Sequence, residues 1–512
     1  MNRTTFTRRE WLTSVGGSLF AASGTHSVWP DSVAAREKTN VIDIGSRREL
    51  FVDDYLIEQL AGEAELRLHH PTPREIAVAH DAPWEGTASS SHTVFQDGEL
   101  YRMYYRGWNF WYENGMLQFS KAVTCYAESK DGIHWTKPEL GLVEFNGSKK
   151  NNIIIHNGIG TLNFSPFIDT NPACPPAARY KAVAGVLAEG GMHVFQSADG
   201  IHWSLMQKEP VLTKGPFDSV NLAFWDPTAK EYRAYRRWIK EGRRAIRTTT
   251  STDLIQWERP SDLTYADSPT EEMYENKVFP YPRAPHILIG LPTRYIERGW
   301  SPSMRALPER NEREERAALS ERFGTALTET LVMASRDGVH FKRWNEAFLR
   351  PGVERPGTWQ YGHQFAAWQF VETESSLPGA PPELSIYAHE RYWHGEGVAL
   401  RRYTLRLDGF VSARTGWKGG RLLTRPLVFD GTQLELNFST SATGSMRVEI
   451  QDEAGTPIER FSLADCPELF GDTIARRVMW KGDADLSELS GKPVRLLFDL
   501  KDADVYSFQF RS

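Results

Sequence analysis

A short phrase built on Asp and Gly recurs five times along the chain, each time at the end of a β-like run. Four copies share a Ser, an Asp two residues later and an aromatic residue four positions after that Asp: 129–135, 197–203, 251–257 and 335–341. A degenerate fifth copy spans 406–410. A repeat at this scale indicates one supersecondary unit copied around an axis, which predicts a β-propeller in which the phrases form turns.

Each repeated unit contains the same parts in the same order. An apolar first strand is followed by a second strand and by a third that runs into the Asp phrase. The first strands are expected at 92–98, 164–169, 222–227, 278–282 and 365–368, and the second strands at 101–106, 180–186, 232–237, 287–295 and 384–391. Five units predict an all-β, five-bladed propeller over 41–420. The strand-like segment 41–57 is expected to pair with the last blade and close the ring.

Two regions depart from this repeat. Residues 301–322 are rich in Glu and Arg, which indicates a helical or mobile insertion within the fourth blade. From 421 onward, apolar and polar residues alternate at 434–438, 446–450, 494–498 and 505–510. This alternation predicts a small antiparallel β-sandwich over 421–512.

The N-terminus looks like a targeting segment. Arg8 and Arg9 precede a short apolar stretch, which is typical of a twin-arginine export signal, here over 1–35. We therefore expect a periplasmic or extracellular protein without a membrane span. Its three cysteines are too few for a disulfide framework, and its net charge of −6 argues against a nucleic-acid partner.

The candidate site follows from propeller geometry. The loops that enter the first strands and those that leave the second strands open on the same face, where ligands bind. Carboxylates that converge there could supply the acid and the base of glycoside hydrolysis. The entries contain Glu85, His92, Asn163, Asp218, Asn221, Glu271, Glu272, Glu275, Tyr361, His363 and Gln364.

The exits of the second strands place Arg beside an aromatic residue in four units. These arginines are Arg106, Arg236, Arg294 and Arg391, and Glu390 precedes the last of them. Guanidinium groups bind carboxylate or sulfate through paired hydrogen bonds, which indicates an anionic glycan. The alternative is that these arginines neutralise the entry carboxylates or pair between blades.

Three motifs add a family resemblance to this pattern. Together with the blade phrases, 50–57 (LFVDDYLI), 83–86 (PWEG) and 424–427 (TRPL) resemble the five-bladed propeller glycoside hydrolases, in particular an exported group similar to families 32 and 43. The resemblance covers most of 41–512. It implies an acid and a base from successive blade entries, allows His363 as the acid, and makes a hydrated calcium ion in the channel plausible. The chain lacks the WMNDPNG run of invertases, and its second blade has no acidic entry residue.

The sequence therefore predicts an exported glycoside hydrolase acting on an anionic or furanose-type glycan. The catalytic candidates are Glu85, Asp218, Glu275, His363 and Glu390, and the substrate-binding candidates are His92, Arg106, Asn221, Arg236, Arg294, Tyr361 and Arg391. Two alternatives stay open: a non-catalytic glycan-binding propeller, and a polysaccharide lyase that uses Arg, His and Tyr361 next to a uronate. The metal ligands and the oligomeric state are not predicted.

Overall fold

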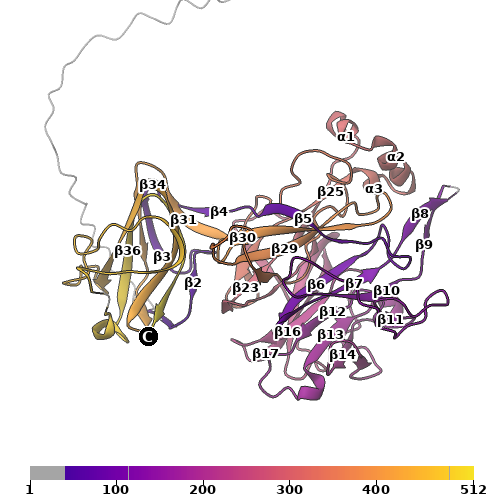
Figure 1. Ribbon diagram of the computed structural model, residues 1–512, viewed down its shortest axis with the longest axis horizontal. Coiled ribbons are helices and arrows are strands. Elements are labelled where there is room, and N and C mark those ends of the chain that lie inside the picture. The colour runs from indigo at the N-terminus through magenta and orange to yellow at the C-terminus, as the bar shows by residue number, and fades with distance from the viewer. Residues whose placement is uncertain (1–40, 114, 484) are drawn as a thin grey trace, which may run out of the picture. The chain divides into compact units, whose positions relative to one another are not determined.

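The computed structural model describes residues 41–113, 115–483 and 485–512, and this part of the chain is nearly all β (Figure 1). The predicted export signal over 1–35 lies outside the described residues. Within those residues, no helix combines the length and apolar character needed to cross a membrane.

Three four-stranded antiparallel sheets follow one another along the chain, and we call them sheets one, two and three. Sheet one contains β6 (Ser90–Asp97), β7 (Leu100–Gly107), β10 (Val123–Ser129) and β11 (Ile153–His156). Sheet two contains β12 (Ser165–Ile168), β13 (Tyr180–Ala184), β14 (His193–Ser197) and β15 (Ser204–Leu205). Sheet three contains β16 (Leu222–Asp226), β17 (Glu231–Lys240), β18 (Arg243–Ser251) and β19 (Ser261–Asp262). The first and second strands predicted for these three units are confirmed.

Short elements lie on the connections between these strands. They are the hairpin β8 (Phe110–Glu113) and β9 (Met116–Phe119) and the 3-10 turns η1 (Pro176–Ala178) and η2 (Leu187–Glu189).

Sheet four is longer and carries the insertion. It contains β20 (Thr264–Ala266), β22 (Phe279–Tyr281), β23 (Ala284–Gly290), β26 (Met333–Ser335) and β27 (His340–Arg343). A three-stranded sheet continues it with β21 (Glu272–Glu275), β24 (Thr293–Glu297) and β25 (Ala326–Thr330). Between β24 and β25 lie α1 (Pro302–Ala306), α2 (Arg310–Leu319) and α3 (Glu321–Thr325), so the insertion is helical. Two buried arginines of α2 tie it to the chain before sheet five: Arg313 donates to the Thr358 carbonyl and Arg316 to Gln360 Oε1.

Sheet five contains β5 (Thr72–Ala79), β28 (Val371–Thr373), β29 (Glu383–Glu390) and β30 (Ala399–Arg406). An N-terminal strand therefore does pair with the last unit, but it is β5, which pairs antiparallel with β30. The prediction that 41–57 closes the ring is wrong, because the strands in that segment pair with β32, β33 and β36 instead.

Side-chain hydrogen bonds join each sheet to the next and the last sheet to the first. The five links are Tyr104 to the Gly200 carbonyl, Tyr232 to Asp169, Tyr235 to the Gly338 carbonyl, Trp368 to the Val278 carbonyl, and Tyr101 to the Glu372 carbonyl. Most donors are tyrosines of the second strand in their unit. The five sheets are thus neighbours in chain order, and the order closes on itself.

The remaining strands form one ten-stranded sheet that draws on both ends of the described chain. From the N-terminal side come β1 (Ile42–Gly45), β2 (Glu49–Leu50), β3 (Ile57–Gly62) and β4 (Glu65–Leu68). From the C-terminal side come β31 (Val411–Thr415), β32 (Gly420–Thr424), β33 (Leu427–Phe429), β34 (Gln433–Asp452), β35 (Asp472–Arg477) and β36 (Val494–Arg511), with the 3-10 turn η3 (Ser487–Leu489) before the last. The strands predicted between 434 and 510 are confirmed. The sheet extends beyond the predicted domain boundary at 420/421. The strands of 42–68 pair with strands on the C-terminal side and therefore belong to this sheet as well.

Four Asp phrases form the turns that the sequence predicts. In the first copy, Asp131 Oδ1 accepts the backbone N–H groups of Ile133 and His134, both at 2.8 Å. The Gly132 N–H donates to Ser129 Oγ at 2.9 Å. The same bonds recur at Asp199, Asp253 and Asp337. Each Asp side chain accepts backbone N–H groups of its own turn, so these four aspartates stabilise the turns.

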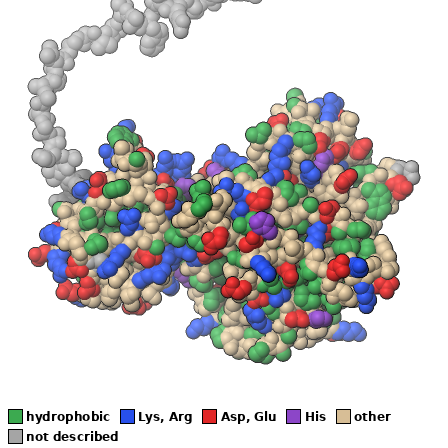
Figure 2. All heavy atoms as spheres, viewed as in Figure 1, with side chains coloured by type: hydrophobic (Ala, Val, Ile, Leu, Met, Phe, Trp, Pro, Cys, Tyr) green, Lys and Arg blue, Asp and Glu red, His purple; other side chains and the backbone are tan. Residues whose placement is uncertain are grey.

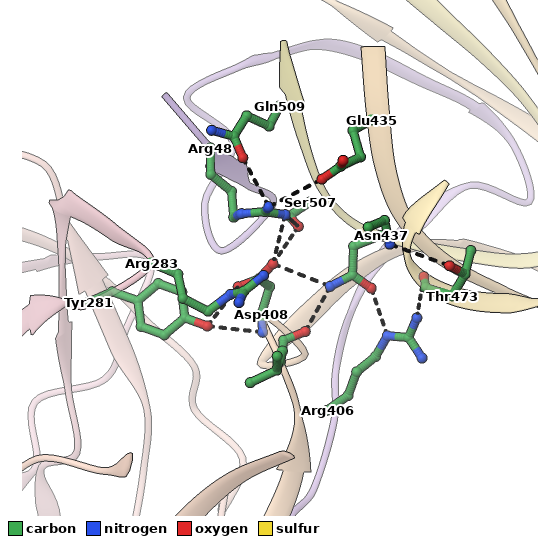
Figure 3. Close-up of polar contacts among 12 residues, drawn as sticks. Arg48, Tyr281, Arg283, Arg406, Asp408, Glu435, Asn437, Thr473, Ser507 and Gln509 are labelled. Atoms are coloured by element: carbon green, nitrogen blue, oxygen red, sulfur yellow. Dashed lines mark hydrogen bonds and ion pairs between the residues drawn. The ribbon is translucent and has the colours of Figure 1, made fainter. Parts of the chain in front are cut away.

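The fifth phrase does not form this turn. Asp408 is fully buried, and its carboxylate accepts hydrogen bonds from Arg48, Tyr281, Arg283, Asn437 and Ser507 (Figure 3). Tyr281 and Arg283 belong to sheet four, whereas Asn437 and Ser507 belong to the ten-stranded sheet. Residues 407–410 do form a turn, as predicted, in which the Gly409 N–H donates to the Arg406 carbonyl at 3.0 Å. The Asp408 carboxylate, however, accepts no N–H group of this turn and instead links two sheets through a buried charge network.

We expect Gly132→Ala to lower the free energy of unfolding by about 2–4 kcal/mol. Gly132 has φ +70°, and an added Cβ would lie 2.8 Å from Thr373 Cγ2 of sheet five. Gly98 has a similar φ of +63° with open space around it, so Gly98→Ala tests the backbone cost alone, about 1 kcal/mol. Denaturant unfolding of both variants measures the difference. Equal losses would contradict the contact between sheets one and five.

Candidate active site

Buried polar atoms without a hydrogen-bond partner gather where first strands begin and second strands end. They include Thr93 Oγ1, Asn221 Oδ1, Asn276 Oδ1, Thr293 Oγ1, His363 Nε2, Gln364 Oε1 and His389 Nδ1. A buried polar group without a partner costs free energy, and native proteins keep such groups mainly where a ligand, ion or water completes them. Their positions coincide with the face that propeller geometry predicts for the site.

Glu275 is a buried carboxylate of this face with an oxygen that lacks a hydrogen-bond partner among the described residues. It ends β21, is 7% exposed, and has an ion pair with Lys277, whose Nζ lies 3.4 Å from Glu275 Oε2. Lys277 itself is 1% exposed and adopts φ +49°. Burial lowers the pKa of the Lys277 ammonium group, and the Glu275 carboxylate opposes that shift. Sequence reasoning identified Glu275 but missed Asn276 and Lys277, although both stand in the same entry segment.

Asp218 is brought toward Glu275 by a shared arginine. Arg237 donates to Asp218 Oδ1 at 2.8 Å and to the carbonyl of Tyr274 at 2.9 Å. The Asp218 side chain is 67% exposed, whereas Arg237 is buried. Arg237 therefore joins the entry loops of sheets three and four and leaves the second Asp218 oxygen open to solvent.

The structure places Glu85 and Glu390 in closed hydrogen-bond sets. Glu85 accepts from Tyr105 at 2.6 Å, Lys137 at 2.6 Å and the Ala82 N–H at 3.0 Å. Glu390 is held by Arg355 and Arg401, which use both carboxylate oxygens. Burial acts in the opposite direction, but these two arginines lower the pKa of Glu390 to about 2. A carboxylate this acidic cannot act as a general acid near neutral pH.

The Glu390 ion pairs should make stability depend on pH. Its folded pKa, about 2, lies below the ordinary 4.5, so the stabilisation is present above pH 4.5 and is lost as pH falls toward 2. We expect Glu390→Gln to destabilise the protein most near neutral pH, with the difference from the wild type shrinking across that window. Unfolding both proteins at a series of pH values tests this. A difference that does not change with pH would contradict it.

The predicted arginines divide into two groups. Arg294 binds Glu271 and Glu329, as the alternative of carboxylate neutralisation predicted. Arg106 and Arg236 have no ion pair to a carboxylate among the described residues; Arg106 lies over the Trp108 ring at 4.5 Å, and Arg236 donates to the Lys214 carbonyl. Arg391 is exposed. Charge of both signs is intermixed over the face of the molecule that Figure 2 shows.

His363 and Tyr361 hold fixed protons at this face. His363 Nδ1 accepts the N–H of Trp359 at 3.0 Å, so the hydrogen of the neutral ring is on Nε2, which has no acceptor. Burial lowers the pKa of His363 to about 3, which makes it a neutral hydrogen-bond donor near neutral pH rather than an imidazolium acid. The Tyr361 hydroxyl lies 2.7 Å from that of Tyr274, and burial raises its pKa well above the usual value. Tyr361 packs among Tyr274, Phe365, Tyr392 and Trp393, an aromatic wall of which only Tyr274 and Trp393 are half-buried and the other rings are buried.

His92 is buried and forms hydrogen bonds with two other histidines, His80 and His389. His92 is one of the predicted blade-entry residues. No sequence pattern indicated His80, which follows β5, or His389, which precedes Glu390 at the end of β29.

Among the described residues, no group of three or more His, Cys, Asp or Glu side chains on this face could hold a calcium ion. Among them, three ionisable donors lie within ligating distance only at Glu309, Glu312 and His394, on and beside the helical insertion. His394 already has both ring nitrogens in ion pairs with those two glutamates. Calcium prefers six to eight oxygen ligands, whereas the charges nearest His389 are Lys277 and Arg106. The channel calcium therefore stays a prediction, and no step is derived through it.

A cavity of about 850 Å³ lies at the other end of the first strands. Its walls are mainly apolar and include the aromatic residues Phe95, Phe167, Phe224, Phe279 and Trp368, one from each of the five units. All five units thus line one cavity. Glu372 is the one acidic residue among the lining side chains, so this end does not supply paired carboxylates.

The comparisons with known proteins concern the fold. No protein-family model and no curated protein matches the chain. An N-acetylgalactosamine deacetylase from F. plautii is 12% identical, with a TM-score of 0.40 over 66% of this chain and 96% of that one. A glycosyl hydrolase from Bacteroides ovatus is 14% identical, with a TM-score of 0.37 over 70% and 93%. An exo-inulinase from Aspergillus awamori is 11% identical, with a TM-score of 0.36 over 86% and 99%.

Glycoside hydrolases recur among these solved structures, which agrees with the resemblance found in the sequence. At these identities and TM-scores the likenesses carry no argument about the reaction. The function is therefore argued from the site alone.

Proposed function

We propose that the protein is a glycan-degrading glycoside hydrolase whose site lies at the entries of the first strands. The observation that carries this proposal is the set of buried, unpartnered hydrogen-bonding atoms on that face, chiefly acceptors such as Asn221 Oδ1, Asn276 Oδ1 and His389 Nδ1. A sugar ring presents several hydroxyl groups, each able to donate and to accept. Such a ligand would complete these atoms together, and the aromatic wall around Tyr361 would pack on its apolar face.

In this proposal Glu275 and Asp218 share the roles of acid and base. Glycoside hydrolysis needs two carboxylates, one to protonate the leaving oxygen and one to activate water or attack the sugar. Glu85 and Glu390 are engaged through both carboxylate oxygens. Among the described residues, Glu275 Oε2 has only the ion pair with Lys277 and no hydrogen bond, and the Asp218 side chain is 67% exposed.

The architecture that we propose is a five-bladed propeller made of sheets one to five. The closed order of hydrogen bonds between sheets and the cavity that residues of all five units line support it. The second domain would be a β-sandwich built on the ten-stranded sheet, with the predicted 421–512 extended by 42–68 and 411–415. Export by the twin-arginine signal over 1–35 remains part of the proposal.

The anionic character of the substrate is proposed from Arg106 and Arg236. Both are desolvated guanidinium groups, and burial lowers the pKa of each. Without a carboxylate in an ion pair, each would gain from binding a uronate or sulfate group. A furanose polymer is the alternative substrate, for which these arginines would bind hydroxyl oxygens.

A non-catalytic glycan-binding protein is the second candidate. It is favoured by the loss of two predicted carboxylates to closed ion-pair networks and by the exposure of Asp218. The lyase alternative is weaker, because burial keeps Tyr361 protonated and it bonds to another tyrosine.

The test is incubation of the purified protein with uronate-containing, sulfated, arabinan and fructan polysaccharides. New reducing ends without ultraviolet absorbance of an unsaturated product would support a hydrolase, and absorbance would indicate a lyase. Retention of a polysaccharide with no product over long incubation would overturn the enzymatic proposal in favour of glycan binding.

A further inference from the structure

Three buried histidines form a hydrogen-bonded chain across the seam between sheet five and sheet one. His80 Nδ1 lies 2.9 Å from the Val398 carbonyl, and His80 Nε2 lies 2.9 Å from His92 Nε2. His92 Nδ1 lies 2.8 Å from His389 Nε2. The rings are 1–2% exposed.

The Val398 carbonyl at one end determines the tautomers of all three histidines when the rings are neutral. A carbonyl oxygen only accepts, so His80 Nδ1 carries the hydrogen and His80 Nε2 is an acceptor. His92 must then donate from Nε2 and accept at Nδ1, and His389 must donate from Nε2. The hydrogen bonds thus leave a lone pair on His389 Nδ1, which is buried and has no partner in the protein.

The charges around the chain keep it neutral. Burial and the neighbouring Lys277 and Arg106 hold the pKa of His389 well below its ordinary value, and His80 and His363 act in the same direction. Burial, the other two rings, Lys277 and Arg106 lower the pKa of His92 likewise.

We infer that His389 Nδ1 is a fixed hydrogen-bond acceptor for one sugar hydroxyl, and that His80 and His92 are positioning residues that set its orientation. This rests on the proposed function, since it names a subsite of the same face. A hydroxyl group suits the place because it can donate to His389 and accept from a cation such as Lys277 or Arg106. An anion would meet the His389 lone pair and be repelled by it.

The tautomer order can be measured without any ligand. Imidazole nitrogen NMR of histidine-labelled protein should show hydrogen on His80 Nδ1, His92 Nε2 and His389 Nε2. His92→Gln should preserve the His389 tautomer, because an amide can accept from His389 and donate to His80. His92→Phe should remove the hydrogen bond to His389 and give a mixture of the two His389 tautomers. An Nδ1–H tautomer at His389 in the wild type would overturn the inference.

Binding is tested with D-galacturonate, D-glucuronate, L-arabinose and D-fructose as probes. At least one should shift the His389 Nδ1 resonance, and His389→Phe should weaken its binding about tenfold or more, because a buried hydroxyl is left unsatisfied. His389→Gln, whose carbonyl can replace Nδ1, should retain part of the affinity. The control His202→Gln, in an exposed turn, should bind as the wild type does.

The outcomes separate this inference from the proposed function. Saccharide binding at His389 without hydrolysis would uphold the acceptor and overturn the hydrolase. Hydrolysis that His389→Phe and His92→Phe leave unchanged in KM and kcat would overturn the acceptor alone. Absence of any His389 shift with all four probes would overturn it as well. Thermal unfolding of each variant identifies losses that come from the fold.

Discussion

Glu275→Gln is expected to lower hydrolysis by about 10²–10⁴-fold while leaving the fold intact. Glutamine has the same shape, so packing at the end of β21 is kept, but it can neither donate nor take up a proton in the reaction. The adjacent Lys277 loses its charge partner, and its lowered pKa allows it to become neutral instead of remaining a buried, unpaired cation. The measurement is kcat on whichever polysaccharide yields new reducing ends.

Glu272→Gln is the matched control for this variant. Glu272 stands on the same strand and pairs with Arg244, and neither of its oxygens is among the unpartnered atoms. Glu272→Gln should retain activity within a few fold of the wild type, because a partly exposed ion pair contributes little to stability. Full activity of Glu275→Gln, with or without an effect of the control, would remove Glu275 from the mechanism.

Asp408→Ala is expected to cost about 3–5 kcal/mol of unfolding free energy, because it leaves buried cations without their counter-charge. Asp408 Oδ1 accepts from Arg283 at 2.8 Å and from Tyr281 at 2.6 Å, and Oδ2 accepts from Ser507 at 2.7 Å (Figure 3). Arg283 and Arg48 lower the pKa of the Asp408 carboxyl, whereas burial acts in the opposite direction. Denaturant unfolding measures the loss.

The phrase aspartates provide the control for Asp408. Asp253 occupies the corresponding position in the third copy, is exposed, and accepts two backbone N–H groups. Asp253→Ala should cost only about 1 kcal/mol. Asp408→Asn keeps the shape of the side chain but removes its charge. Its loss of unfolding free energy should lie between those of Asp408→Ala and Asp253→Ala. Similar losses at both positions would show that the buried network contributes little beyond a turn.

The sequence predicted the fold well where it repeats. The Ser-x-Asp phrase specifies its turn through local hydrogen bonds, so four copies could be identified from residues within seven positions of each other. Counting these turns gave five units, and the first two strands of each lie close to the predicted positions except in the last unit, where the first strand is β28 (Val371–Thr373) and not 365–368. The prediction failed for 41–57 and did not include the buried network of Asp408, because pairing β1 with β33 and placing Arg48 beside Asp408 depend on residues hundreds of positions away.

The position of the candidate site stays a prediction, and the structure changes which of its residues are available. Glu275, Asn221, His92 and Arg106 are buried or half-buried residues of the predicted entries and exits. No pattern could indicate that Arg355 and Arg401 engage Glu390, since these partners come from a loop and a neighbouring strand. Lys277 and His389 were missed because burial of a polar residue is invisible without the fold.

The repeated Asp phrase thus determined by itself the β class, the repeat and the face on which to look, because turn chemistry is local. The tertiary structure alone decided which carboxylates are free, which strand closes the last sheet, and which histidine keeps an open lone pair. Those properties depend on desolvation and on contacts between distant segments, which exist only once the sheets have packed together.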